Sequence, residues 1–405
     1  MFETRKKVTR WGRCGLAMTG FAVALPGVVA IAEESDIIRG KTGPWGALEM
    51  VHCQFEPPAW YLDAAGFETM PGDWHFPGFT REKVTAYLES IGMEQSQVAS
   101  LFSDLPEPQP SDGVILRPSA ELIRKLSREQ RGRLYGDLAR SDRNLMQQLP
   151  FSIDPRGFAH MAKGSGLDGD LVSEVTSMVY LKDGLPVFAD LPLLLEEIPD
   201  PAGKRRLLSV LLRQEGMLVR VKIPESHEER RIMADYWSGG IRDRNSRLLA
   251  LLDSLSKGEG AGVPMDLLYL PPPNARKLIN TYPPQESQVG NVAPDCFWTA
   301  FNFLADEVSD RALDPGMIDR YLEDRYEPVP DEPVFGDVIV FSDPETLVPF
   351  HACVYLADRL IFTENGQSLL RPWVLMRLDD LAVSYWGDRP MAAHVFRRIR
   401  EPDQP

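Results

Sequence analysis

The sequence predicts an α+β fold in which a mostly helical, loop-rich N-terminal region precedes a C-terminal domain made of a helix and a small antiparallel sheet. In the last quarter of the chain, one helical pattern is followed by several short apolar runs, an order typical of α+β domains. The middle of the chain contains amphipathic patterns with N-cap residues. Pro and Gly are frequent, 34 and 31 of 405 residues, and predict many turns between these elements.

Residues 1–32 are expected to form a signal peptide. Five basic residues lie ahead of an apolar run over residues 15–32, which ends in the cleavage pattern Ala30-Ile31-Ala32. An uncleaved membrane anchor is the alternative, but the run is barely long enough to span a bilayer and contains Pro26-Gly27. We therefore expect an exported bacterial protein, periplasmic or extracellular, with no membrane span after cleavage.

The charge and the cysteine count limit the partners and the chemistry. The chain has a net charge of −15, and residues 1–32 carry five basic groups and one acid, so the mature chain carries −19. Such an excess of carboxylates argues against nucleic acid as a partner. Cleavage leaves Cys53, Cys296 and Cys353, an odd number that permits one disulfide and one free thiol.

Helices are expected at several places in the N-terminal region. An amphipathic pattern predicts one over residues 81–91, and residues 119–140 predict two more. Ser119 is an N-cap for the first of these, and Ser127 with Gln130 forms a capping box for the second. Ahead of residue 81 the sequence is irregular and rich in aromatic residues, with no regular pattern.

A further helix, a strand and a last helix follow before the C-terminal domain. Asp200-Pro201 marks the start of a helix that is expected to end at Gly216, and alternation over residues 219–223 predicts a strand directly after it. The last helix is expected over residues 246–256. Proline clusters at residues 271–273 and 283–284 place the domain boundary near residue 280, which separates a region of unknown role, 33–280, from a domain over 281–405.

The C-terminal domain is expected to begin with a helix near Cys296. Short strands are predicted at residues 337–341, 351–356 and 360–363, a short helix at 378–385 and a final strand at 392–398.

Cys296 is the candidate nucleophile. Asp295 is a suitable N-cap, so Cys296 falls in the first turn of the predicted helix, where unpaired N–H groups and the helix dipole favour a thiolate over a thiol. The alternative is a buried structural cysteine, and for the segment by itself this alternative is the commoner case.

Two later segments favour a catalytic Cys296 over a buried structural cysteine. His351 opens a predicted strand, and Asn365 lies in an Asn-Gly turn at the end of the next one. A cysteine at a helix start, a histidine on a strand and a polar residue on the next strand form a Cys-His-X triad. In it the histidine accepts the thiol proton and the third group orients the ring. Asn365 is our choice for that third group, and Thr363 is the other candidate.

Together these segments resemble the NlpC/P60 family. The similarity lies in Asp295-Cys296 opening a helix, Gly336-Asp337 before an apolar strand, and His351 ahead of Val354-Tyr355-Leu356. The resemblance implies a papain-like domain that hydrolyses amide bonds, often in peptidoglycan peptides, with Cys296 as nucleophile and His351 as base. Phe297-Trp298 replace the small residues usual after the cysteine, and the third polar residue falls later than the family spacing. Residues 33–280 resemble no family.

The hypothesis is therefore a cysteine amidohydrolase or peptidase with the catalytic residues Cys296, His351 and Asn365, a peptide or cell-wall amide as substrate, and no cofactor. A thiol acyltransferase with the same residues is an alternative, because both reactions pass through a thioester. A non-enzymatic envelope interaction or scaffold protein that uses a hydrolase-like fold is the other. His52-Cys53 and His75 lack the spacing of a zinc site, so no metal is expected.

Overall fold

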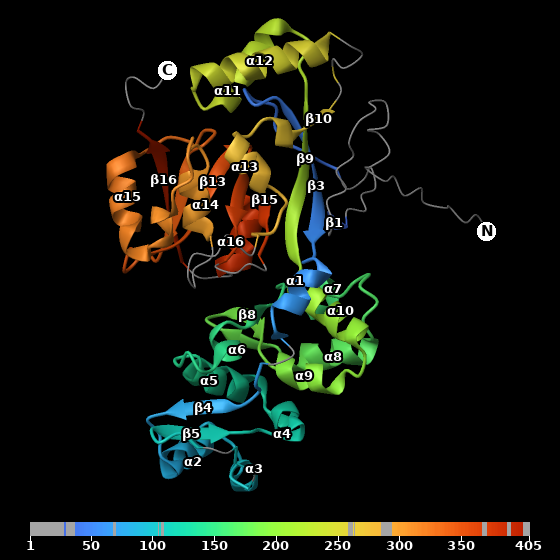
Figure 1. Ribbon diagram of the computed structural model, residues 1–405, viewed down its shortest axis with the longest axis vertical. Coiled ribbons are helices and arrows are strands. Elements are labelled where there is room, and N and C mark those ends of the chain that lie inside the picture. Colours follow the sequence, from blue (N-terminus) through green and yellow to red (C-terminus); the bar gives the residue numbers. More distant parts are fainter. Residues whose placement is uncertain are drawn as a thin grey trace, which may run out of the picture. The chain divides into compact units, whose positions relative to one another are not determined.

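The computed structural model contains both helices and antiparallel sheets, which confirms the α+β class (Figure 1). The residues that it describes are 28–29, 37–67, 70–103, 105–106, 109–257, 262, 264–284, 294–366, 371–386 and 390–399. Most of the predicted signal peptide thus lies outside the described residues. None of the described helices is both long and apolar enough to cross a membrane.

The chain divides into two compact units, which are described separately here. The first unit comprises residues 1–57, 214–382 and 390–405, and the second comprises 58–213 and 383–389. This division differs from the boundary expected near residue 280. The reason is that β9, a long strand on the N-terminal side of residue 280, packs with strand β15 of the C-terminal domain, and β3 pairs with β9 in the same unit.

The first sheet of the first unit is built on β3 (Ala47–Phe55) and β9 (Gln214–Lys222), which pair antiparallel along their whole length. β10 (Pro264–Asp266) pairs with β9, and β2 (Ile38–Arg39) and β1 (Val28–Val29) pair with β3. The strand expected over residues 219–223 is confirmed as part of β9. β3 lies in a region where the sequence indicated no regular structure.

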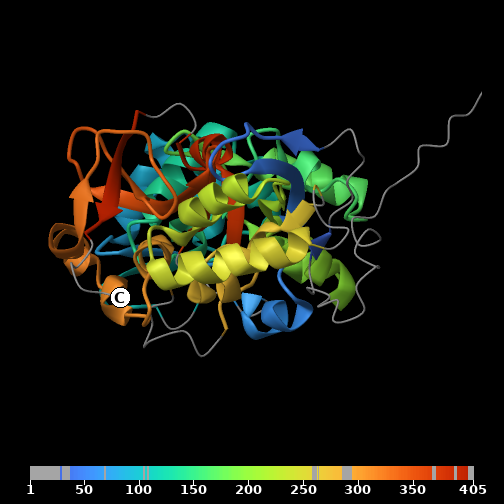
Figure 2. The same ribbon diagram turned by 90° about the horizontal axis from the view of Figure 1, so that it is seen from above.

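Two helices lie between β9 and β10 in the chain, α11 (His227–Ser238) and α12 (Arg242–Ser256), and they lie side by side (Figures 1 and 2). Arg230 of α11 donates to Asp253 of α12 over 2.7 Å. Buried Trp237 donates its indole N–H to the carbonyl of Trp45. The helix expected over residues 246–256 is thus confirmed within α12.

The second sheet of the first unit has six antiparallel strands in the order β11-β16-β12-β13-β14-β15. The strands are β11 (Tyr326–Pro328), β12 (Val338–Ser342), β13 (Pro349–Ala357), β14 (Leu360–Glu364), β15 (Trp373–Arg377) and β16 (Ala392–Arg398). The helices associated with it are α13 (Pro273–Leu278), α14 (Cys296–Asn302), α15 (Ile318–Arg325) and α16 (Leu378–Trp386). The strands and helices predicted beyond residue 290 are confirmed, whereas β11, β15 and α15 were not predicted.

The Gly336-Asp337 motif has a structural role in this sheet. Gly336 has a φ of +90°, a conformation that residues with a Cβ rarely adopt. The Asp337 carboxylate, which is buried, accepts from Nε and a terminal nitrogen of Arg397, over 2.9 and 2.7 Å, and thereby joins the start of β12 to β16. A bidentate pair of this kind fixes both side chains in one geometry.

Gly336→Ala is expected to lower the free energy of unfolding by about 1–3 kcal/mol, because alanine is strained at positive φ. Its Cβ would also lie 2.6 Å from Leu304 Cδ1, which would have to move. Urea unfolding measures the loss. Gly136→Ala is the control, because Gly136 lies in helix α5 with open space around it. There alanine is expected to stabilise by about 0.5–1 kcal/mol. Equal effects of the two substitutions would contradict the explanation.

The second unit is mainly helical. Its helices are α1 (Ala59–Ala64), α2 (Arg81–Ser90), α3 (Gln95–Leu101), α4 (Ala120–Lys125), α5 (Arg128–Leu138), α6 (Leu145–Gln148), α7 (Phe158–Met161), α8 (Gly169–Met178), α9 (Leu191–Glu197) and α10 (Pro201–Leu211). Its strands are β4 (Trp74–Pro77) and β5 (Gly113–Leu116), which pair with each other, and β6 (Phe151–Ser152), β7 (Tyr180–Lys182) and β8 (Leu185–Phe188), which form the order β6-β8-β7.

The predicted caps in this unit are confirmed. Ser119 accepts from the amide of Leu122, and Ser127 with Gln130 forms both hydrogen bonds of a capping box. Asp200 caps α10, but this helix ends at Leu211 rather than at Gly216. The earlier end follows from β9, which begins at Gln214 and takes Gly216 into its pairing with Cys53 of β3.

Candidate active site

Cys296 is the first residue of α14, as predicted. Asp295 is the N-cap, and its carboxylate accepts from the amide of Trp298 over 2.9 Å. The helix packs against β13 and β14, and every residue in it is buried, so the Cys296 side chain is only 7% exposed. Trp373 of β15 donates its indole N–H to Thr299 and holds the helix on the sheet.

His351 lies near the start of β13 and is 1% exposed. Its Nε2 lies 3.1 Å from the Thr363 hydroxyl, and its ring stacks on Phe341. The Thr363 hydroxyl also lies 3.3 Å from Oδ1 of Asn365, whose amide nitrogen is 3.2 Å from the Met376 sulfur. Of the two candidates for the orienting role, Thr363 thus contacts the ring directly and Asn365 contacts Thr363.

The pairing of β12 with β13 shows which face of the sheet each side chain occupies. Val340 pairs with Ala352, and both belong to the core that includes α14. Phe341 pairs with His351, and successive side chains of a strand point to opposite faces. The His351 ring is therefore directed to the face that carries Phe341 and Thr363, and α14 covers the other face.

The electrostatics of Cys296 differ from the expectation. Burial raises the pKa of the thiol well above its usual value, and the nearby charges of Asp295 and Glu364 raise it further. A hydrogen bond from the main-chain amide of Ala352 opposes this rise. The expected lowering of the pKa by the helix start is thus outweighed, because burial penalises the thiolate more strongly than the helix end favours it.

His351 is neutral over the physiological pH range. Burial lowers its pKa from 6.5 to about 3, because the cationic ring loses its hydration in the packed sheet. A protonated thiol and a neutral imidazole are the protonation states from which a general base begins its work. The described arrangement thus holds the two groups in their uncharged forms.

Glu364 is a residue of this site that the sequence analysis missed. It is the last residue of β14, is 0% exposed, and lies on the α14 face, where it pairs with Trp373. Neither carboxylate oxygen has a hydrogen-bond partner among the residues that the structure describes. Burial raises its pKa well above the usual value. One feature of the sequence could have indicated it: the apolar strand Leu360–Glu364 ends in a charged glutamate and not in an apolar residue.

A cavity of about 160 Å³ lies beside α14. It is lined by residues of α13, α14 and β14, among them Lys277, Thr299 and Phe362. Its volume suits a few water molecules or a small side chain.

All three cysteines that the structure describes are free thiols, so no disulfide joins Cys53, Cys296 and Cys353. Cys353 is two residues from His351, on the same face of β13, and is completely buried. Burial raises the pKa of Cys53 to about 12 and that of Cys353 still further. These two thiols are thus poor nucleophiles.

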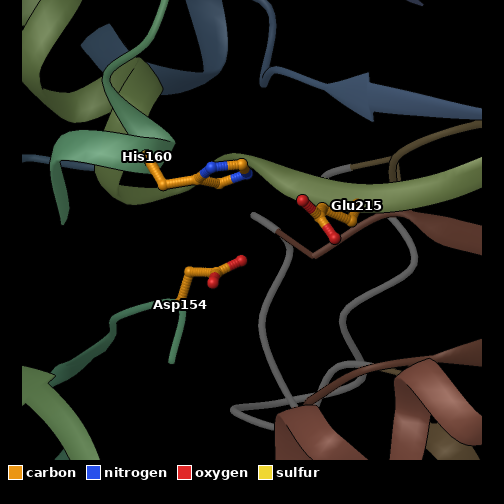
Figure 3. Close-up of side chains that lie close together, drawn as sticks. All are labelled: Asp154, His160 and Glu215. Atoms are coloured by element: carbon orange, nitrogen blue, oxygen red, sulfur yellow. The ribbon is translucent and has the colours of Figure 1, made fainter. Parts of the chain in front are cut away.

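Figure 3 draws the side chains of Asp154, His160 and Glu215. Asp154 and His160 belong to the second unit, and an Asp154 oxygen lies within 4.8 Å of a His160 ring nitrogen. Asp154 also pairs with Arg156 at 2.5 Å. Glu215 belongs to the first unit. Two side chains from one unit offer fewer ligands than the three or four that a zinc site takes.

Comparisons of the chain with family models, with curated proteins and with solved structures gave no match.

Proposed function

We propose that the chain is an exported, thiol-dependent hydrolase of amide bonds, with peptides such as those of peptidoglycan as its substrate class. The supporting observation is that residues far apart in the sequence come together at one end of the sheet. Cys296 of α14 receives a hydrogen bond from the amide of Ala352, the residue after His351, and His351 in turn contacts Thr363.

In this proposal Cys296 is the nucleophile and forms a thioester with the acyl part of the substrate. His351 is the predicted general base, and Thr363 and Asn365 hold its ring. The ring has to leave the face of Phe341 to reach the thiol, since α14 covers the opposite face. The first residues of β13 allow such a movement, because the pairing with β12 is irregular between Phe341 and Ser342.

Cys296→Ala is expected to abolish hydrolysis, with a loss of several orders of magnitude, because no other group can form the thioester. Cys353→Ala is the matched control, a buried thiol of the same domain, and should retain the rate. Activity is measured as release of peptides from purified peptidoglycan and as cleavage of amide-linked muropeptides, with circular dichroism as a check of folding. Wild-type protein that cleaves neither substrate, or Cys296→Ala protein that keeps its rate, would contradict the proposal.

A second candidate function is a non-enzymatic envelope protein that uses this fold as a binding scaffold. One observation favours it: Cys296, His351 and Glu364 are all buried, and the pKa of the thiol is raised. On this alternative the thiol is inert, and peptidoglycan fragments bind without cleavage. Binding that persists equally in wild-type and Cys296→Ala protein, with no product released, would support it.

A further inference from the structure

Glu364 is a buried carboxyl group of the first unit to which the proposed function gives no role. A buried carboxyl group without a hydrogen bond destabilises the folded chain, so such groups are rare in proteins and each needs an explanation. Both oxygens of Glu364 lack a partner in the described part of the chain, and the side chain has no exposed area. An apolar residue such as leucine at this position would avoid this destabilisation.

The register of the sheet places Glu364 next to Cys296. Val354 pairs with Phe362, so the same antiparallel register sets Ala352 opposite Glu364. Both side chains face α14, and the Cys296 thiol lies at the amide of Ala352. Phe362, two residues before Glu364, contacts Phe303 at the end of α14 with ring centroids 5.8 Å apart. The charges of Glu364 and of Asp295, the N-cap of α14, act on each other and on Cys296, so the Glu364 carboxylate lies near the first turn of that helix.

We infer that Glu364 is the group that accepts the Cys296 proton, so that a Cys–Glu pair is the reactive unit on the α14 face of the sheet. The inference depends on the proposed function, since it concerns how the same thiol becomes a nucleophile. Glu364 here takes the role of base that the proposed function gives to His351, whose ring lies on the other face of the sheet.

The proton transfer balances within the pair. The ionised carboxylate of Glu364 takes the proton as the sulfur attacks: the S–H bond breaks and an O–H bond forms on Glu364. The sulfur forms its bond to the amide carbon, and the electron pair of the C=O bond moves to its oxygen. The raised pKa of Glu364 makes its carboxylate a stronger base than an exposed glutamate.

Few other charged groups act on this pair. Asp295, ahead of α14, adds negative charge that favours the protonated form of Glu364, and Arg371, ahead of β15, opposes it. On the α13 side, Lys277 lines the adjoining cavity. His351, Cys353 and Tyr355 are the titratable groups of β13, and all three lie on the far face. Two interacting acids lose their protons as a coupled unit, so the pair has its own apparent pKa values.

The test is the pH dependence of alkylation of Cys296 in the full chain by iodoacetamide, where a C–S bond forms and iodide leaves. Mass spectrometry of the Cys296 peptide gives the rate between pH 5 and 10. In the wild type we expect the rate to rise first where Glu364 ionises, above pH 4.5 and below the ionisation of the thiol. Glu364→Gln should remove this rise and lower the rate at pH 7 roughly 10- to 100-fold.

Three variants identify the acceptor. Glu345→Gln, at an exposed glutamate of the same domain, is the control and should keep the first rise, and Glu364→Asp should keep part of it. His351→Gln separates the two candidate bases, because the rise persists if Glu364 is the acceptor and is lost if His351 is. Loss of the rise in His351→Gln would overturn the inference. So would a faster reaction of Glu364→Gln at pH 7, because Glu364 would then merely repel the thiolate.

Cys353 reports on folding in the same digest, because it is completely buried and should stay unreactive in every folded variant. If Glu364→Gln does not fold, the wild-type profile decides: a rate that increases only with ionisation of the thiol would overturn the inference. Alkylation needs no hydrolysis. A wild-type protein without hydrolytic activity would therefore contradict the proposed function, but the alkylation rates would still test the role of Glu364.

Discussion

Arg131→Met is expected to lower the free energy of unfolding of the second unit by about 3–5 kcal/mol, the usual cost of breaking a buried ion pair. Arg131 in α5 and Asp190 are both buried, and Nε lies 2.9 Å from the carboxylate. The guanidinium also donates to the carbonyls of Leu126 and Ile123, and Tyr135 donates to Asp190. Methionine removes every donor of Arg131 and leaves the Asp190 carboxylate buried with Tyr135 alone.

Urea unfolding measures this loss, and two further variants test its cause. Arg124→Met removes a comparable ion pair with Glu174 and Glu197 at the surface, and should cost about 0–1 kcal/mol. Arg131→Met combined with Asp190→Leu should recover most of the loss, because no unpaired charge is then buried. A double variant no more stable than Arg131→Met would show that packing, and not the charge, accounts for the effect.

His351 is expected to make the first unit unstable in acid. Its pKa is about 3 in the folded chain and 6.5 when exposed, so the unfolded chain binds the proton first as the pH falls. The contribution of neutral His351 to the free energy of unfolding is fully present above pH 6.5. It is lost progressively toward pH 3, by roughly 4–5 kcal/mol over that interval. At pH 4.5 the loss should be roughly 2–3 kcal/mol.

His351→Gln isolates this contribution, because it removes the titrating ring and keeps a polar side chain of similar size. The difference in unfolding free energy between wild type and His351→Gln should shrink by roughly 2–3 kcal/mol between pH 7.5 and pH 4.5. Glu364 changes stability in the opposite direction, since its raised pKa favours the folded chain in acid, but it is present in both proteins. His394→Gln, at an exposed histidine of β16, should show no such change. A constant difference for His351→Gln would contradict the buried neutral ring.

Much of the fold was predictable from local signals. Caps at Ser119, Ser127 and Asp200 fix where helices begin, and the apolar runs after residue 336 give the order of strands. β3 was missed because apolar and polar residues do not alternate clearly along it. Its buried residues include the consecutive pair Met50 and Val51. Tertiary packing, and not local pattern, makes this segment a strand.

The candidate site was predictable in its elements but not in its geometry. Cys296 at a helix start and His351 on a strand follow from spacing, but which face of β13 carries the ring depends on register with β12. A shift of one residue would turn the ring toward α14. Burial of Cys296 and Glu364 depends on packing across the whole unit, so their raised pKa values could not be derived from the sequence.

The pairing of β3 with β9 has a consequence for the order of folding. Phe55, the last residue of β3, pairs with Gln214, the first residue of β9, so residues 56–213 form one long excursion between neighbouring strand ends. Closing so long a loop costs chain entropy before any β3–β9 hydrogen bond forms, whereas the short-range helices of the second unit have no such cost. We therefore expect the second unit to fold first and to shorten the loop that the sheet of the first unit must close.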